Sequence, residues 1–169
     1  MKEHDIVAPS AWVVRWAPLI THGTVLDVAC GGGRHSKYLL DRGLKVVAVD
    51  RKPQAIPGAR FVQVDLENGN PWPLPGERFE GVVVTNYLYR DLFPRILEAV
   101  APGGVLIYET FMLGNERYGK PSNPEFLLRP GELLESFKGL TVKAFEEGAV
   151  TEPKPAMIQR LCAVQAGKG

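Results

Sequence analysis

The sequence predicts a single α/β domain over residues 1–169, built on a mostly parallel sheet. The length of 169 residues is that of one domain. Short β-branched runs alternate with helical segments, which is typical of parallel strands covered on both faces by crossover helices. No period of about 20 to 50 residues repeats, which excludes solenoids and propellers.

Local patterns predict the elements of the N-terminal half. Ser10 is expected to cap a short helix that ends near Leu19, because apolar side chains recur there at helical spacing. A second helix is expected over residues 34–41, with Gly43 supplying a left-handed stop after it. Four strands are expected at residues 24–29, 44–50, 60–65 and 79–86.

The connection between the second and third strands is too short for an ordinary crossover helix. It carries Pro53 and Pro57 within RKPQAIPGA, whereas a crossover normally needs about a dozen residues or more. We therefore predict that this crossover has lost most or all of its helix. Residues 68–76 hold three further prolines and are expected to form an extended loop.

The C-terminal half is predicted to complete the sheet. Its expected elements are a helix over 89–100, a turn at 101–104, a strand over 105–110, a loop over 111–129, a helix starting at Pro130, and an antiparallel pair at 140–145 and 159–165. A loop as long as 111–129 in a small domain is often functional, for example as a lid.

Composition excludes several classes of protein. Twenty Lys and Arg against nineteen Asp and Glu give a net charge of +1, which disfavours a dedicated nucleic-acid binder. Cys30 and Cys162 are too few for a disulfide framework and lack the spacing of a metal site, so we expect reduced thiols and no metal. The sequence shows no signal-peptide pattern and no apolar run long enough to span a membrane, so a cytoplasmic protein is expected.

The stretch VLDVACGGGRHS, residues 25–36, contains the residues that indicate a ligand-binding site. Gly31 and Gly33 would let the backbone approach a ligand closely after the first strand. Asp50 ends the next strand, where a carboxylate can accept hydrogen bonds from both hydroxyls of a ribose. Together these residues predict a nucleoside site.

Two cofactors compete for that site. The glycines give G-x-G-x-x-S, a weak match to the fingerprint of nicotinamide dinucleotides. Asp27 argues against that cofactor, because a carboxylate two residues before the turn would repel a pyrophosphate. S-adenosylmethionine (SAM) carries an ammonium group and no phosphate, so the same carboxylate favours it.

The chain resembles the class I SAM-dependent methyltransferases, whose first motif is similar to V-L-D-x-G-C-G-x-G. In VLDVACGGG, Ala29 stands where the family usually has glycine. Later motifs follow in the family's order: the acid at Asp50, Asp65 with Leu66 after the third strand, and Asn86 with Tyr87 after the fourth. The small size and the FLLRPGELL segment look most similar to the tellurite-resistance-type bacterial methyltransferases.

The resemblance implies a Rossmann-like seven-stranded methyltransferase sheet of order 3-2-1-4-5-7-6 with strand 7 antiparallel. It implies a cofactor site formed by Asp27, Ala29, Gly31, Gly33, Asp50, Arg51, Asp65, Leu66 and Asn86. Candidate acceptor-binding residues are Tyr87, Tyr89, Arg90 and Tyr118, and Glu109 and Tyr87 are the candidate catalytic residues. Glu109 has an alternative interpretation as an ion-pair partner of a basic side chain such as Arg90. His35 is expected to be a capping or packing residue, with direct contact to the substrate or cofactor as its alternative.

The implied reaction is methyl transfer from SAM to a small-molecule acceptor such as a thiol or a metalloid oxyanion, which leaves S-adenosylhomocysteine. A monomer or a homodimer is expected. Two alternatives stay open: a SAM-binding partner subunit without catalysis, and a nicotinamide oxidoreductase. Fold analogy does not name the acceptor.

Overall fold

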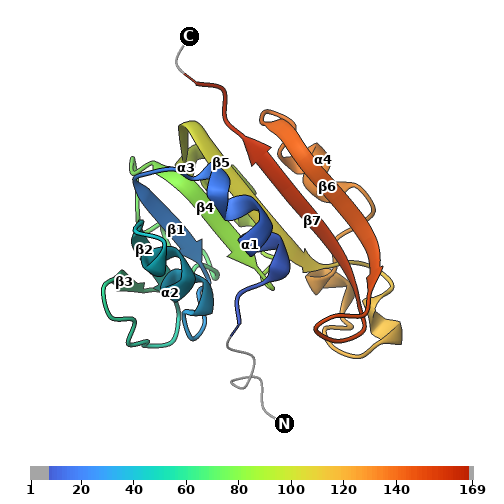
Figure 1. Cartoon of the computed structure of the whole chain (residues 1–169). Helices are drawn as coiled ribbons and strands as arrows, with labels where there is room; N and C mark the ends of the chain where they lie inside the picture. The colour runs from blue at the N-terminus through green and yellow to red at the C-terminus, as the bar shows by residue number, and fades with distance from the viewer. Residues whose placement is uncertain (1–7, 168–169) are drawn as a thin grey trace.

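Seven strands form one sheet in the order β3-β2-β1-β4-β5-β7-β6 (Figure 1). The computed structural model describes residues 8–167, so residues 1–7 and 168–169 of the predicted domain lie outside the described part. The strands are β1 (Thr24–Val28), β2 (Lys45–Asp50), β3 (Arg60–Gln63), β4 (Phe79–Thr85), β5 (Val100–Phe111), β6 (Thr141–Val150) and β7 (Ala156–Val164). β7 is antiparallel to both of its neighbours and the other pairs are parallel, which confirms the predicted topology.

Helices cover both faces of the sheet and create two apolar cores. In Figure 1, α1 (Ala11–Trp16) and α2 (Arg34–Asp41) lie in front of the strands, whereas α3 (Phe93–Ala99) and α4 (Glu132–Ser136) lie behind them. The front core holds Trp12 and Leu39, and the rear core holds Phe93 and Leu133. Each central strand is therefore buried on both faces, which explains its continuous apolar sequence.

The first two helices follow the predicted capping chemistry. The Ser10 side chain accepts hydrogen bonds from the N–H groups of Trp12 and Val13, and the short helix continues as a 3-10 turn to Leu19. α2 has the predicted bounds, and Gly43 after it has a φ of 88°. Glycine adopts this left-handed conformation without the steric cost of a Cβ atom.

The crossover between β2 and β3 has no helix, as predicted. Residues 51–59 and the proline-rich connection 64–78 contain no helix in the structure. None of the four residues of β3 is buried. This edge of the sheet consequently lacks the helical cover that the central strands have.

Two predicted boundaries are wrong around β5 and α4. Residues 101–104 belong to β5, which begins at Val100 and passes an irregularity in its pairing with β4, so they form no separate turn. α4 begins at Glu132 instead of Pro130, because Gly131 takes a left-handed φ of 69° and caps the helix.

Other elements have the predicted type but different lengths. The helix predicted over 89–100 is a 3-10 turn, η3 (Arg90–Leu92), followed by α3, which starts one residue before Pro94. The closing antiparallel pair forms a longer hairpin than predicted, because β6 continues to Val150 and β7 begins at Ala156.

The segment 111–129 is ordered by its own turns and by hydrogen bonds. It contains two 3-10 turns, η4 (Asn115–Arg117) and η5 (Pro124–Phe126), and a bridge joins Met112 to Leu128. The Asn115 side chain is buried; its amide donates to the Pro121 carbonyl and its oxygen accepts from the Met157 N–H.

Among the helices of residues 8–167, none has the length and apolarity needed to cross a membrane.

Candidate functional site

The candidate site lies where the parallel strands end, at the lower edge of the sheet in Figure 1. The pairing register places Val28 beside Val49 on β2 and beside Val84 on β4. The residues that follow these three positions therefore meet at one edge, where open α/β sheets bind their ligands.

The turn after β1 is built from left-handed residues. Ala29, Gly31 and Gly33 have φ values of 53°, 55° and 89°. A Cβ atom added to Gly31 or Gly32 would meet nothing within 4 Å, whereas one added to Gly33 would lie 2.9 Å from the Ile56 side chain. The turn is thus open beside its first two glycines and packed at the third, so it offers a cradle for a ligand.

Asp50 holds this turn in place from the end of β2. One oxygen of its carboxylate accepts a hydrogen bond from the Gly31 N–H at 2.8 Å, and the other accepts from the Lys52 N–H at 3.0 Å. The residue predicted to bind ribose therefore sits directly beside the glycine turn, with acceptor capacity remaining on both oxygens.

Asp27 lies beneath the turn instead of at its surface. Its side chain is 1% exposed and accepts a hydrogen bond of 2.7 Å from the Ser36 hydroxyl. Burial raises the pKa of Asp27 to about 6 against the opposing effect of the Ser36 hydrogen bonds. Asp27 thus supports the turn and the start of α2 from below.

His35 and Cys30 are both buried, which agrees with the packing role expected for His35. Cys30 is buried under the turn, and burial raises the pKa of its thiol to about 12. The His35 ring accepts from the Ser10 N–H at 3.0 Å, and its other nitrogen lies 3.3 Å from the Thr85 hydroxyl. Burial lowers the pKa of His35 to about 3, so the ring is neutral at physiological pH.

Glu109 forms an ion pair, as its alternative interpretation predicted, but with a different partner. Its carboxylate accepts from Arg160 Nε at 2.5 Å and from the Ser10 hydroxyl at 2.7 Å. The prediction of Arg90 as partner is wrong, because that side chain lies on the other face and pairs with Glu132.

The residues after β3 and β4 meet through a contact that the sequence did not reveal. The Tyr87 hydroxyl donates to the Glu67 carboxylate at 3.1 Å, and burial together with Glu67 raises the pKa of Tyr87. Asp65 accepts hydrogen bonds from the Glu67 N–H and the Asn68 amide, so its carboxylate is used within its own turn. Asn86 has a left-handed φ of 54°.

Arg90 serves the neighbouring loop. Its guanidinium binds Glu132 through two hydrogen bonds of 2.6 and 3.0 Å, and it also donates to the carbonyls of Glu125 and Leu127. All of these partners lie in residues 125–132. Arg90 therefore fastens the end of the 111–129 segment, and its predicted contact with an acceptor has no support from this geometry.

Tyr89 borders a separate hollow on the rear face. This cavity of about 340 Å³ is lined by Leu66, Gly69, Asn70, Pro71, Trp72, Tyr89, Asp91, Leu92 and Arg95. Leu66, which was predicted to belong to the cofactor site, lines this cavity. The cavity occupies the region that the helix-free connection 64–78 leaves uncovered.

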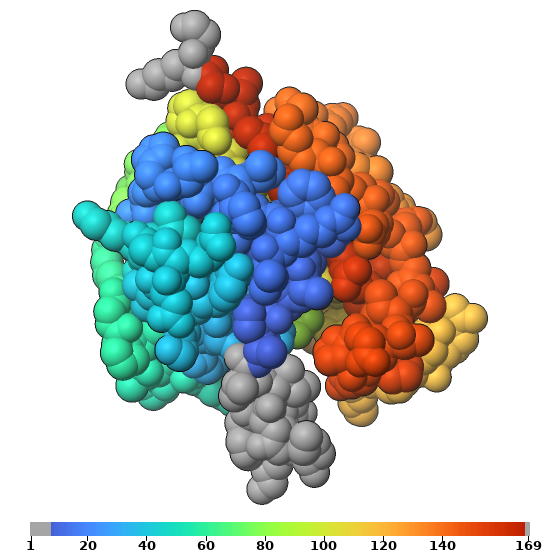
Figure 2. Space-filling model, viewed as in Figure 1, coloured from blue at the N-terminus to red at the C-terminus, as the bar shows by residue number. Residues whose placement is uncertain are grey.

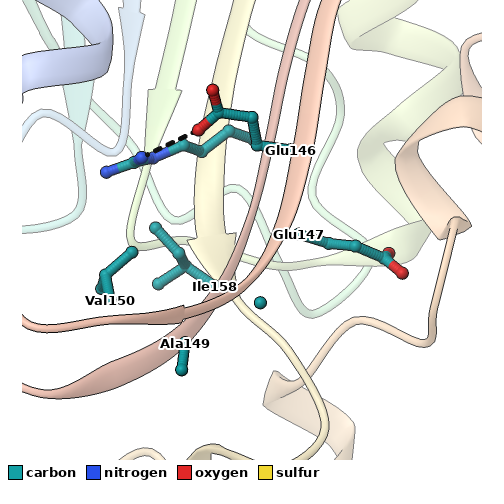
Figure 3. A pocket seen from close by; sticks show the side chains of 7 residues that line it. Glu146, Glu147, Ala149, Val150 and Ile158 are labelled. Carbon is teal, nitrogen blue, oxygen red and sulfur yellow. Dashed lines mark hydrogen bonds and ion pairs between the residues drawn. The ribbon is translucent and has the colours of Figure 1, made fainter.

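The β6–β7 hairpin carries a further pocket that is lined only by residues of the hairpin. Figure 2 shows the molecule hollowed between the blue N-terminal region and the orange turn of this hairpin. The pocket measures about 80 Å³, and in Figure 3 the side chains of Glu146, Val150 and Ile158 extend to one side of the hairpin whereas that of Glu147 extends to the other. Glu146 pairs with Arg160 and with Arg15 of α1, which joins the hairpin to that helix.

Three remaining residues, Arg51, Tyr118 and Arg34, are at least partly exposed. Arg51 is exposed after β2, and its carbonyl accepts from the Gln63 side chain. Tyr118 is 46% exposed in the 111–129 segment. Arg34, which sequence reasoning passed over, is the first residue of α2 and donates to the Ala8 carbonyl at 3.0 Å. Its position directly after the glycines was the sequence feature that could have drawn attention to it.

Residues 25–104 match the protein family described as "Methyltransferase domain". Among curated relatives, the chain is 30% identical over 109 residues to a trans-aconitate 2-methyltransferase from Methylobacterium nodulans, covering 58% of this chain and 42% of the relative. It is 30% identical over 158 residues to a tRNA U34 carboxymethyltransferase from Shewanella piezotolerans, covering 73% and 47%. The chain thus spans less than half the length of each relative.

Solved structures share the fold. TehB from Haemophilus influenzae superposes with a TM-score of 0.75 at 18% identity, over 96% of this chain and 64% of TehB. A 1,6-didemethyltoxoflavin-N1-methyltransferase from Burkholderia thailandensis, with its bound substrate and S-adenosylhomocysteine, gives 0.69 at 21% identity, over 95% and 79%. The matched domain over residues 25–104, with the glycine turn at its start, and the sheet order are therefore features that this chain shares with SAM-dependent methyltransferases.

Proposed function

We propose that this chain binds SAM at the carboxyl ends of β1, β2 and β3 and transfers its methyl group to a small-molecule acceptor. The observation that carries the proposal is the open glycine turn held by Asp50. The space beside Gly31 and Gly32 fits the amino-acid part of SAM, and the Asp50 carboxylate fits its ribose hydroxyls. The nearby Leu66 and Asn86 are proposed to border the adenine and the methyl group.

When bound, SAM supplies an activated methyl group on a sulfonium. The chain's own contribution is to hold donor and acceptor at the same edge of the sheet and to exclude water between them. Positioning of this kind lowers a barrier by as much as about 7 to 11 kcal/mol. The parts of the chain proposed to exclude water are the N-terminal segment from residue 8 to Ser10, the β6–β7 hairpin and residues 86–89.

The acceptor is proposed to be an anion or a soft nucleophile, because neither of the two candidate catalytic residues is free to take a proton. Glu109 is bound by Arg160 and Ser10, and Tyr87 keeps its proton and donates it to Glu67. A thiolate, a metalloid oxyanion or a carboxylate needs no base. The relative that methylates trans-aconitate supports a small carboxylate as one member of this class.

Calorimetric titration tests the binding step. The proposal requires that the purified chain binds SAM and S-adenosylhomocysteine at millimolar concentration or below. If the chain bound neither SAM nor S-adenosylhomocysteine, the proposed function would be wrong. Quenching of NADH fluorescence by the chain, together with indifference to SAM, would support the oxidoreductase alternative instead.

An acceptor screen tests the transfer step. S-adenosylhomocysteine release is measured with a thiol, with tellurite and selenite, with small carboxylates, and with matched alcohols and amines. We expect turnover only with the first three groups, and with the thiol a pH dependence that follows the ionisation of the acceptor itself. Cofactor binding without turnover on any acceptor would favour the partner-subunit alternative. A cytoplasmic location and a monomeric or dimeric state stay predictions.

A further inference from the structure

The cavity of about 340 Å³ on the rear face is formed by two segments of the chain. One is the helix-free connection 64–78, and the other is the segment 89–95 that contains η3 and the start of α3. None of the residues that line the cavity belongs to the glycine turn or to the end of β2. Sites for small molecules measure about 300 to 1,000 Å³, so this cavity has room for a small ligand of its own.

Two aromatic side chains line the cavity, one from each segment. Trp72 comes from the connection and Tyr89 from the segment after β4, and both are half-buried. The indole N–H of Trp72 donates to the Leu74 carbonyl at 3.1 Å, which holds the ring in place before a ligand arrives. Leu66 and Leu92 add aliphatic surface. The lining therefore suits a ligand with an apolar body.

The charges around the cavity favour a cation. Asp91 lines it directly. Burial raises the pKa of Tyr89, and the charges of Asp91 and Glu67 raise it further, so both carboxylates act on this phenol. The single arginine of the lining, Arg95, is paired with Glu98 at 3.2 Å. A positively charged ligand is consequently favoured over an anion.

Hydrogen-bond donors of the lining are already engaged within the chain. The Asn70 side chain donates to the Asp65 carbonyl at 2.9 Å, and the Asn70 N–H donates to the Glu67 carbonyl. The indole N–H of Trp72 is engaged as well. The Glu67 carboxylate, by contrast, accepts from the neutral Tyr87 hydroxyl and keeps its charge uncompensated by that bond. Acceptors and aromatic rings therefore outnumber the free donors, a combination that matches an ammonium group.

We propose that this cavity binds a small organic cation, a quaternary or protonated amine with an apolar body, against Trp72 and Tyr89 and beside Asp91. Ammonium groups are attracted to the faces of Trp and Tyr rings, and a nearby carboxylate adds to the attraction. Such a cation does not belong to the class of methyl acceptors proposed above. The cavity is therefore a second site, and its occupation does not depend on the proposed function.

The test compares three ligands of similar shape and different charge. Choline, 3,3-dimethylbutan-1-ol and 3,3-dimethylbutanoate are titrated into the full chain, and backbone amide shifts are followed by nuclear magnetic resonance. The variants are W72L and D91N. Trp16 is half-buried on α1 and Asp41 is exposed at the end of α2, so W16L and D41N are the matched controls. Circular dichroism checks that each variant is folded.

We expect choline to bind the wild-type chain, W16L and D41N at millimolar concentration or below, about 5- to 30-fold more tightly than the alcohol. The carboxylate should bind more weakly still, and the shifts should lie in residues 66–72 and 89–95. W72L and D91N should each reduce the preference for choline over the alcohol by about 2- to 5-fold. Asp91 is exposed, so D91N keeps the test decisive if W72L does not fold.

Equal affinity for choline and the alcohol would overturn the inference, as would tighter binding of the carboxylate or an unchanged preference in D91N. Displacement of choline by S-adenosylhomocysteine would also overturn it, because the cavity would then belong to the cofactor site. Failure of the chain to bind SAM and S-adenosylhomocysteine would overturn the proposed function alone.

Discussion

At the scale of single residues, two carboxylates flank the glycine turn and their surroundings give them different tasks. Asp50 is half-exposed and accepts hydrogen bonds from two backbone N–H groups. Asp27 is buried beneath the turn with a hydroxyl as its side-chain partner. Asp50 is therefore suited to binding a ligand, whereas ionisation of the buried Asp27 destabilises the folded state.

Replacing Asp50 by alanine should weaken SAM binding by about 1.5 to 3 kcal/mol, roughly 10- to 150-fold in Kd. The substitution removes the proposed ribose contacts and also the support of the turn at Gly31. Calorimetry measures the effect, and D41A, which removes an exposed ion pair with Lys37 on α2, is the control with unchanged affinity. Wild-type affinity in D50A would remove Asp50 from the site.

Replacing Asp27 by asparagine should stabilise the protein near neutral pH. Because burial raises the folded pKa from 3.8 to about 6, the folded state holds the proton more tightly than the unfolded state. Stability is therefore lost as pH rises from 3.8 through 6, and it stays lost above that range. Asparagine keeps an acceptor for Ser36 and avoids this cost, so D27N should gain up to about 3 kcal/mol near pH 7.5.

Urea denaturation at about pH 4 and about pH 7.5 checks this prediction, and D41N serves as the exposed control. The advantage of D27N should shrink at the lower pH, where the wild-type carboxyl is protonated. If D27N were instead less stable than the wild-type protein near pH 7.5, the charge of Asp27 would be shown to stabilise the turn.

At the scale of elements, an arginine clamp joins the region after β4 to the loop that precedes α4. Arg90 binds Glu132, and both side chains also bind the backbone of residues 125–129. Burial alone would raise the pKa of Glu132, but the hydrogen bonds and charges of Arg90 and Arg129 lower it overall. The segment 111–129 is thus fastened at its C-terminal end by this clamp and at its N-terminal end by Asn115.

The R90M variant should lose about 3 kcal/mol of unfolding free energy, because it leaves the 5%-exposed Glu132 side chain without its main partner. The second change in R90M/E132L removes the stranded charge, so the double variant should be more stable than R90M. R95M breaks an exposed pair with Glu98 and should change stability by less than about 1 kcal/mol. Additive losses in the double variant would show that the two side chains are not coupled.

At the scale of the whole molecule, the sheet is covered unevenly. Helices lie over the central strands, but residues 51–59 and 64–78 pass the β3 edge without one. The side proposed to hold adenine is therefore bordered by extended chain and by the cavity next to Trp72 and Leu66. A binding surface built from such connections is less preorganised than one backed by helices.

This open flank predicts moderate affinity for SAM, with a Kd in the micromolar range or weaker. Ordering residues 51–59 and 64–78 around a ligand would consume part of the binding free energy. Calorimetry on the full chain gives the value directly. A submicromolar Kd would show that these connections are already fixed in the geometry that the ligand needs.

Local chemistry in the sequence determined most of the fold and the centre of the site. Glycine spacing, the acid that ends β2, the Ser10 cap and the prolines of residues 51–59 each act through the backbone of their own segment. α2 and the helix-free crossover were therefore predicted correctly. The strand order, which is also correct, was implied by the resemblance to the methyltransferase family. Boundaries near Gly131 and Val100 were missed because a cap geometry and a strand irregularity override local propensity there.

Only the tertiary structure decided which charges are available to a ligand. Arg160 lies about fifty residues after Glu109 in the chain, and Glu132 lies about forty after Arg90, yet these are the pairs that form. The neutralised Glu109, the buried Asp27 and the cationic Arg34 follow from such long-range contacts. A sequence specifies which groups can ionise, but partners and burial arise from the packing of distant segments, and these set the cost of each charge.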